Sequence, residues 1–181
     1  MHFTLTDLVT DITQNAAEAG ASLVELEVSE NEKEFRFLVK DNGKGMTEEE
    51  LKRATDPFVT DGIKHPNRKV GLGLPFLIQT SEQTGGGWDI KSEKGKGTAV
   101  TAWFDTGNVD IPPLGDIPGM FRTILMFDSD AEFIIRRKKL KNGAEEEYEI
   151  SKSEIADAIG GFEEVSSLVL LKDYLNSLEE E

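Results

Sequence analysis

Alternation of apolar and polar residues predicts a β-hairpin early in the chain. Valine and leucine alternate with glutamate over residues 24–28, and every second residue from 35 to 39 is phenylalanine or valine. Such period-two patterns are typical of strands that bury one face. The polar segment 29–33 between them fits a turn. Asp41 is therefore expected where the second strand leaves the sheet.

Helical spacing predicts an amphipathic helix over residues 7–19, with Thr6 as its N-cap and Gly20 at its end. Apolar residues recur every three or four positions at Leu5, Leu8, Ile12, Ala16 and Ala19. Another face carries Asp11 and Asn15, one turn apart. A solvated face would explain them, but asparagine is a poor helix-interior residue. We therefore interpret the pair as candidates for contacting one bound ion or water.

Apolar periodicity and turn residues predict further helices and strands in the rest of the chain. Before residue 106 these are a helix capped by Thr47, a connection over 55–69, a helix through Thr84, and strands at 88–92 and 98–104. After it they are a strand at 123–128, a hairpin of 132–139 and 145–150 turning on Asn142-Gly143, a helix capped by Ser151, and a helix from about 162. The last helix is expected to bury Val165, Leu168, Val169, Leu171, Leu175 and Leu178.

The segment 106–113, with its glycine and paired prolines, is typical of a boundary. We expect one domain over residues 1–105 and a C-terminal extension of hairpin and helices over residues 106–181. The extension contains no motif with apparent chemistry.

Composition narrows the function. The 181 residues carry a formal net charge of −15, which argues against general nucleic-acid binding because that depends on neutralising phosphates. The absence of cysteine excludes disulfides, thiol catalysis and cysteine-ligated zinc. No apolar run is long enough to span a membrane and no secretory signal is visible, so a cytoplasmic location is expected. The basic run 136–141 fits the solvated end of a hairpin better than a binding patch.

Glycine motifs supply the candidate chemistry. Asp41-x-Gly43-x-Gly45 places a carboxylate and bare backbone where a strand ends, which suits a flat or anionic ligand. Gly71-x-Gly73 opens a helix, whose free N–H groups suit phosphate. Gly95-x-Gly97-Thr98 joins two predicted strands. Each motif is weak alone, but their order after Asp11-x-x-x-Asn15 is specific.

These four signals in this order resemble the superfamily of gyrase ATPases, heat-shock chaperone ATPases, histidine kinases and mismatch-repair ATPases, which share the Bergerat fold. The resemblance covers about residues 5–105. Residues 15–21 are similar to the mismatch-repair branch, and residues 56–60 before Gly71-Leu72-Gly73-Leu74 to the histidine-kinase branch. The resemblance to this superfamily implies an α+β two-layer sandwich with a mixed β-sheet and helices on one face.

The resemblance also implies ATP and Mg²⁺ as ligands. Asn15 would complete the coordination of Mg²⁺, Asp41 would accept a hydrogen bond from the adenine amino group, and Thr98 would share the water bound there. Further residues would surround the nucleotide: Gly43 and Gly45 close to the base, Met46 packed on it, and Gly71, Leu72, Gly73 and Leu74 around the phosphates. A lid of about residues 55–70 would cover them, with Lys64 or Lys69 as candidate phosphate contacts.

Two departures from the family pattern shape the expected function. Asp11 stands where hydrolytic members place glutamate, and its shorter side chain predicts slow or no hydrolysis by this candidate catalytic acid. The chain also lacks the helical hairpin that carries a kinase's phosphoacceptor, and neither His2 nor His65 is suitably placed.

The leading hypothesis is a kinase-like protein that passes phosphate from ATP to a separate partner protein. An ATP-switched binding protein is the alternative. The net charge of −15 argues against a mismatch-repair-like ATPase, which would act on DNA. A globular domain with incidental glycines is the least supported hypothesis.

Overall fold

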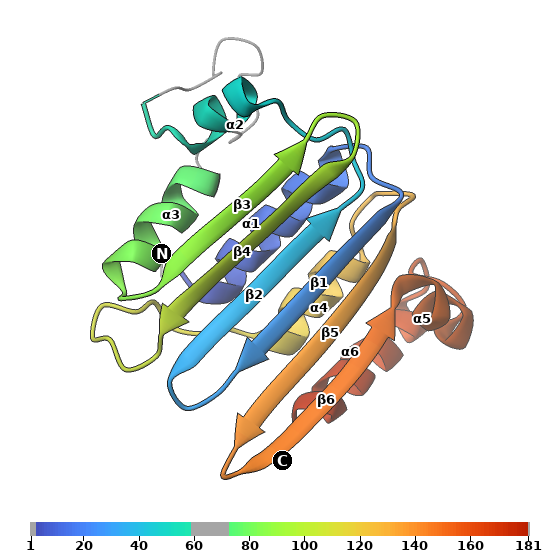
Figure 1. The fold of residues 1–181 in the computed structure, drawn as a ribbon. Coiled ribbons are helices and arrows are strands. Elements are labelled where there is room, and N and C mark those ends of the chain that lie inside the picture. Colours follow the sequence, from blue (N-terminus) through green and yellow to red (C-terminus); the bar gives the residue numbers. More distant parts are fainter. Residues whose placement is uncertain (1–2, 59–72, 181) are drawn as a thin grey trace.

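A six-stranded mixed sheet forms one layer of the computed structural model, which describes residues 3–58 and 73–180 (Figure 1). The strand order is β3-β4-β2-β1-β5-β6. All neighbours are antiparallel except β1 and β5, which run parallel. The strands are β1 Leu23–Glu30, β2 Glu34–Asp41, β3 Gly87–Glu93, β4 Gly97–Asp105, β5 Glu132–Lys141 and β6 Ala144–Ser151.

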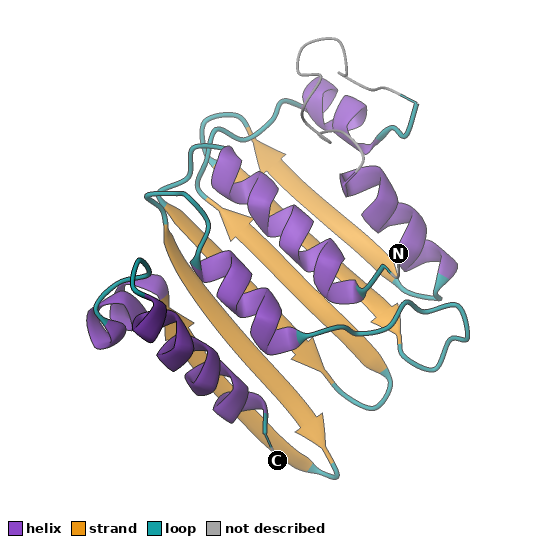
Figure 2. Cartoon of the chain, turned by 180° about the vertical axis from the view of Figure 1, so that it is seen from behind, coloured by secondary structure: helices purple, strands orange, loops and turns teal. Residues whose placement is uncertain are grey.

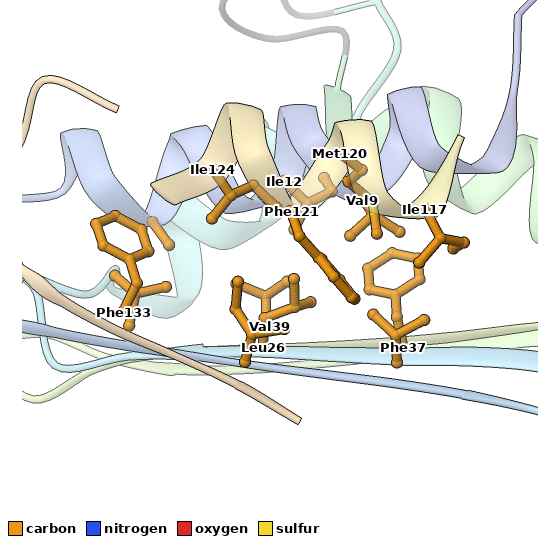
Figure 3. Close-up of a cluster of buried hydrophobic side chains, with 14 of the residues drawn as sticks. Val9, Ile12, Leu26, Phe37, Val39, Ile117, Met120, Phe121, Ile124 and Phe133 are labelled. Atoms are coloured by element: carbon orange, nitrogen blue, oxygen red, sulfur yellow. The ribbon is translucent and has the colours of Figure 1, made fainter. Parts of the chain in front are cut away.

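The helices form the second layer on one face of this sheet (Figure 2). They are α1 Leu5–Glu18, α2 Glu48–Thr55, α3 Gly73–Gln83, α4 Ile117–Leu125, α5 Lys152–Ile159 and α6 Val165–Glu179. Val9 and Ile12 of α1 and Phe121 of α4 point toward Leu26 and Phe37 of the sheet (Figure 3). The predicted α+β two-layer sandwich with a mixed sheet is confirmed. None of the described helices is both long and apolar enough to cross a membrane.

The predicted β1–β2 hairpin is confirmed, and its register places Asp41. Val24 pairs with Asp41 at the open end of the hairpin, and Asp41 pairs with Thr98 of β4 on its other side. Asp41 is therefore the last residue of a central strand, on the face that the helices cover.

Helix α1 begins earlier than predicted. Thr4, not Thr6, is the N-cap: its hydroxyl accepts from the Asp7 backbone N–H at 3.2 Å, and its own N–H donates to the Asp7 carboxylate at 2.9 Å. This reciprocal pair is a capping box, in which Asp7 takes the place of the usual glutamate. Leu5 therefore falls inside the helix and is buried.

The predicted strand at 123–128 is wrong, because residues 117–125 form helix α4. Apolar residues there recur at helical spacing and are buried: Ile117, Met120, Phe121, Ile124 and Leu125. Asp116 caps the helix by accepting from the Gly119 N–H at 3.0 Å, and Pro118 lies in the first turn, where no helical N–H is needed.

The C-terminal hairpin turns at the predicted residues. Asn142 and Gly143 both have positive φ, +52° and +79°, as a two-residue turn of this kind requires. The Ser151 cap of α5 is also confirmed. In the last helix Leu171 and Leu175 are buried, but Val165 and Val169 are 77% and 52% exposed, because the buried stripe runs through Ser167 instead.

The segment after residue 106 shares the sheet and the core with the segment before it. β5 pairs with β1 along its length, and α4 lies between α1 and α6. The division into a domain over residues 1–105 and a C-terminal extension over residues 106–181 remains a prediction.

The basic run 136–141 meets an acidic run on β6. Arg136 lies opposite Glu149 and Lys138 opposite Glu147, so opposite charges pair across the hairpin. The expectation of a solvated hairpin end is wrong for Arg137, whose side chain is only 1% exposed.

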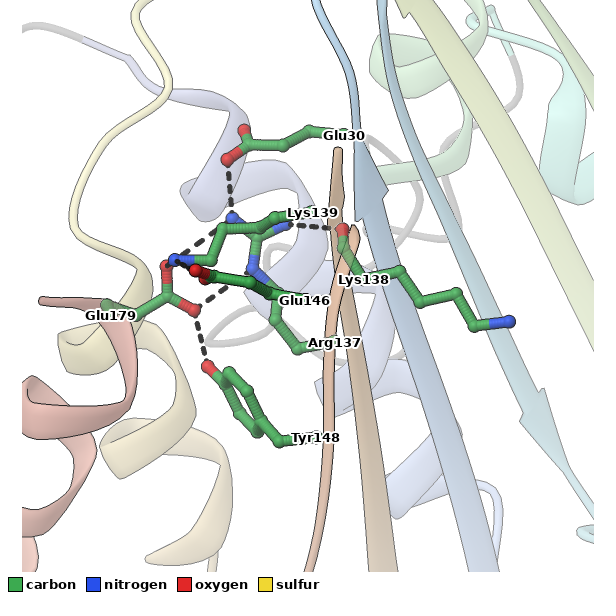
Figure 4. Close-up of polar contacts among 7 residues, drawn as sticks. All are labelled: Glu30, Arg137, Lys138, Lys139, Glu146, Tyr148 and Glu179. Carbon is green, nitrogen blue, oxygen red and sulfur yellow. Dashed lines mark hydrogen bonds and ion pairs between the residues drawn. The ribbon is translucent and has the colours of Figure 1, made fainter. Parts of the chain in front are cut away.

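Arg137 is the centre of a buried polar cluster that joins the sheet to α6 (Figure 4). Its guanidinium donates to Glu30 at 2.6 Å and to Glu179 at 3.1 Å. The Tyr148 hydroxyl also donates to Glu179, and Lys139 lies 3.0 Å from the same carboxylate. Because Glu179 is the last residue of α6, the cluster fastens the end of that helix to β1, β5 and β6.

Candidate functional site

A cleft of about 360 Å³ opens between α1, α2, the start of α3 and the ends of β2 and β4. Its size is within the range of small-molecule sites. Its lining is Ile12, Asn15, Ala16, Glu18, Ala19, Val39, Asp41, Lys44, Gly45, Met46, Glu50, Arg53, Ala54, Gly73, Leu74, Thr98 and Val100. The cleft thus brings together residues from all four sequence motifs.

Asp41 provides a buried acceptor in the cleft. Its side chain is 8% exposed, and one carboxylate oxygen accepts from the Gly43 backbone N–H at 2.8 Å. Burial raises the pKa of the Asp41 carboxyl above its ordinary value, although backbone hydrogen bonds from Gly43 and Thr98 act in the opposite direction. The side chain can satisfy a ligand donor that enters the cleft.

Close backbone contacts explain the three glycines beside Asp41: Gly43, Gly45 and Gly97. Gly45 has φ +63°, and a Cβ there would lie 1.9 Å from the carbonyl oxygen of Glu93. A Cβ on Gly97 would lie 2.0 Å from the carbonyl oxygen of Asp41 itself. Gly43 is not part of the lining; it donates its N–H to Asp41, and a Cβ there would lie 2.6 Å from the carbonyl oxygen of Ala19. These glycines let the turns after β2 and β3 close around the carboxylate.

A serine that the sequence analysis missed connects these turns. The Ser92 hydroxyl of β3 accepts from the Met46 N–H at 2.8 Å and lies 2.8 Å from the Thr98 hydroxyl. It is also 3.2 Å from the carbonyl oxygen of Gly97. The only sequence signal was its position opposite Thr98 in the predicted β3–β4 hairpin.

The other end of the cleft lies where α1 meets the start of α3. Asn15 is exposed, and a Cβ on Gly73 would lie 3.4 Å from its side-chain nitrogen, so the bare glycine leaves room beside the amide. Leu74 lines the cleft next to Gly73. Gly71, Leu72 and the lid candidates Lys64 and Lys69 lie outside the described residues.

Asp11 lies one turn before Asn15 on α1 and is exposed, but it is not among the residues that line the cleft. The structure therefore brings Asn15, Asp41, Gly45, Met46, Gly73, Leu74 and Thr98 to one cleft and leaves Asp11 at its margin.

Four charged residues of the cleft were not anticipated: Glu18, Lys44, Glu50 and Arg53. Lys94 from the β3–β4 turn binds Glu50 at 3.0 Å, which joins that turn to α2 and lowers the pKa of Glu50. Lys44 could have been identified in the sequence, since it lies between Gly43 and Gly45 of the glycine motif. Nothing in the sequence distinguished Arg53 from an ordinary helix-surface arginine.

Part of the chain is similar in sequence to known proteins. The model of a family described as "Histidine kinase-, DNA gyrase B-, and HSP90-like ATPase" matches residues 3–108. The sensor protein SrrB of Staphylococcus aureus strains NCTC 8325 and COL is 34% identical over 95 residues, which are 50% of this chain and 16% of that protein. The chain thus matches only a small part of these curated relatives.

Among solved structures, the N-terminal domain of a DNA repair protein is similar, with a TM-score of 0.52 and 14% sequence identity. The similarity covers 80% of this chain and 51% of the other. At this identity the likeness concerns the fold alone.

Proposed function

Because the chain belongs to the family of histidine kinase-, DNA gyrase B- and HSP90-like ATPases, we propose that it binds ATP in the cleft and passes phosphate to a separate partner protein. The observation that carries this proposal is a buried acceptor, Asp41, sharing one cleft with Asn15 and Gly73 at the start of a helix. The two ends suit a base and a phosphate group respectively.

At the base end, Asp41 would accept from the adenine amino group, and Met46 would pack on the ring. An acceptor favours adenine over guanine, since guanine presents a carbonyl oxygen at the corresponding position. Val39 and Val100 supply apolar surface beneath the ring.

At the phosphate end, the residues present fit Mg²⁺ bound together with a nucleotide. The Asn15 side-chain oxygen is a hard ligand of the type that Mg²⁺ takes, and Gly73 leaves space beside the nitrogen of the same amide. Within residues 3–58 and 73–180, no three histidine or carboxylate side chains are grouped to hold a metal alone. The ion would offset the phosphates' negative charge, which matters in a protein with a net charge of −15.

A relative named as a sensor protein supports a role in signalling. The two histidines of this chain, His2 and His65, lie outside the described residues. We place the phosphoacceptor on a separate protein, which would dock over the phosphate end of the cleft.

A second candidate, an ATP-switched binding protein without turnover, is favoured by one observation. Asp11, the acid expected to orient water, does not line the cleft. Retention of intact ATP would then be the functional state.

Incubation of the protein with γ-labelled ATP in extract of its native cells separates the candidates. Label appearing on a second protein supports transfer, and label remaining with intact ATP on this chain supports the switch. A variant with Asp41→Asn run in parallel identifies signal that depends on the cleft. Failure of the purified chain to bind ATP at all would overturn both candidates.

Replacement of Asn15 by alanine is expected to weaken ATP binding in Mg²⁺ by about tenfold or more, because one ligand of the metal is lost. Adenosine has no phosphates and should bind nearly as in the wild type. Titration of both ligands by calorimetry tests this. Equal losses for ATP and adenosine would mean that Asn15 supports the structure and not the metal.

Asp11 is expected to limit hydrolysis. A base must come within about 3 Å of the water it activates, and a displacement of about 1 Å can cost a hundredfold in rate. We predict little or no phosphate release by the wild type and a measurable gain for Asp11→Glu, whose side chain is one methylene longer. Brisk hydrolysis by the wild type with no gain in the variant would favour an ATPase.

A further inference from the structure

We infer that Ser92 is a positioning residue that sets the preference for adenine over guanine by directing the hydroxyl of Thr98, an inference that rests on the proposed binding of ATP. Ser92 belongs to edge strand β3, and it pairs with Thr98 of β4 across the hairpin. Thr98 lines the cleft and pairs with Asp41 on its other side, whereas Ser92 is not part of the lining. Any effect of Ser92 on a ligand therefore passes through its neighbours.

The hydrogen bonds around Ser92 leave one choice open for its single hydroxyl proton. Its oxygen already accepts from the Met46 N–H at 2.8 Å. Its proton is directed either to the carbonyl oxygen of Gly97 at 3.2 Å or to the Thr98 oxygen at 2.8 Å. The 2.8 Å contact can form with either hydroxyl as its donor. If Thr98 donated, the Ser92 proton would be left with the Gly97 carbonyl oxygen at 3.2 Å, which is beyond the usual range for an O–H donor. We assign the proton to the bond from Ser92 to Thr98.

This assignment fixes what Thr98 presents to the cleft. With its oxygen accepting from Ser92, the proton of Thr98 is free to donate toward a ligand, directly or through one water. Beside it, the Asp41 carboxylate accepts. An acceptor next to a donor complements the adenine edge, which carries an amino donor next to the N1 acceptor. Guanine has the opposite order, a carbonyl acceptor next to the N1–H donor.

Without the Ser92 hydroxyl this order would be lost. Thr98 would then rotate freely, and its oxygen would accept from guanine N1–H as readily as its proton would reach adenine N1. Met46 would at the same time lose the acceptor of its backbone N–H. The first change alters the choice between bases, and the second weakens the binding of any base. The two effects can be separated by measuring ATP and GTP together.

The experiment measures the affinities for ATP and GTP by calorimetry in the wild type and in Ser92→Ala, Ser92→Thr and Ser167→Ala. Ser92→Ala should lower the ratio of ATP to GTP affinity about three- to tenfold, the range of one hydrogen bond. Ser92→Thr keeps the hydroxyl on a strand-compatible side chain and should retain the wild-type ratio. Ser167→Ala is the matched control, since it removes a hydroxyl that donates to the backbone carbonyl of Ile159 in the C-terminal region, away from the cleft.

A double-mutant cycle tests whether Ser92 acts through Thr98. Because the cycle compares several variants, its result does not depend on the folding of any single one. Thr98→Val should lower the ATP:GTP ratio by itself, and adding Ser92→Ala should then leave the ratio unchanged. If Ser92→Ala weakens the binding of ATP and GTP equally, or if the effects add in the double variant, the inference about Ser92 is overturned while the proposed binding of ATP stands. A wild type that binds neither nucleotide would overturn the proposed function with it.

Discussion

Replacement of Asp41 by asparagine is expected to lower the affinity for ATP about ten- to a hundredfold. A charge-assisted hydrogen bond contributes roughly 1.5–3 kcal/mol, which corresponds to this range. The carboxylate is buried in the cleft and can only accept, whereas an amide can turn an N–H toward the adenine donor. Calorimetric titration with ATP measures the difference, and wild-type affinity in the variant would remove Asp41 from base recognition.

Asp105→Asn provides a closely matched control. Asp105 also ends a strand, and its carboxylate also accepts from the N–H of a glycine two residues later, at 2.8 Å. It is exposed and is not part of the cleft. The same chemical change at the same type of turn should therefore leave ATP binding unchanged.

The raised pKa of Asp41 gives this prediction a second readout. An acid whose pKa is higher in the folded state stabilises the fold below its unfolded pKa, and this contribution is lost as the pH rises through the folded pKa. At neutral pH the ionised carboxylate is thus a cost to the apoprotein. Asp41→Asn should leave the unfolding free energy at pH 7 unchanged or slightly higher. A large loss of stability would show that the carboxylate has a structural role instead.

Replacement of Glu179 by glutamine is expected to lower the unfolding free energy by about 3 kcal/mol, as for other buried ion pairs that lose one partner. Arg137 is 1% exposed, so its charge has no access to water when the carboxylate is removed. Glu30 still compensates part of that charge, which places the expected loss at the lower end of the range. Denaturant unfolding of both proteins at pH 7 measures it.

Glu147→Gln is the control for this variant. Glu147 also faces a cation of β5, Lys138, but at 3.8 Å and with both side chains about half exposed. Exposed pairs of this kind contribute roughly 0–1 kcal/mol. Equal effects of the two substitutions would show that burial of the Arg137 cluster adds nothing to stability.

The pH dependence of Glu179→Gln has a defined sign. Burial raises the pKa of Glu179, but hydrogen bonds from Tyr148 and Arg137 and the charge of Arg137 outweigh it, so the net pKa is lowered from 4.5. The contribution to stability is present above the unfolded pKa and lost as the pH falls through the folded value. The difference in unfolding free energy between the wild type and Glu179→Gln should be fully present at pH 7 and should shrink below about pH 4.5.

Local patterns predicted most of the elements, and the errors have identifiable causes. The β1–β2 hairpin and the Asn142-Gly143 turn were predictable because alternation and turn chemistry act over a few residues. Helix α4 was missed because its short apolar stretch fits a strand as well as a helix, and packing on α1 decides between them. The buried state of Arg137 depends on Glu30 and Glu179, which lie far away in the sequence.

For the site, the sequence identified positions where backbone conformation or chemistry is demanding. Gly45 stands out because its φ is positive, and Asp41 because a carboxylate at the end of an apolar strand is unusual. Ser92 could not be identified in this way, since a serine in a strand requires nothing locally. Its contacts with Met46 and Thr98 arise only when two turns meet in space.

The parallel pairing of β1 with β5 has a consequence for how the chain folds during synthesis. Leu23 pairs with Glu132, so most of the chain is made before β1 gains its second neighbour. Until then β1 is the edge of a nascent four-stranded sheet, and an open edge can pair with other chains. Such distant contacts also slow folding. The cleft strands β2 and β4 are complete while that edge is still exposed, which makes the nascent chain prone to aggregation before β5 emerges.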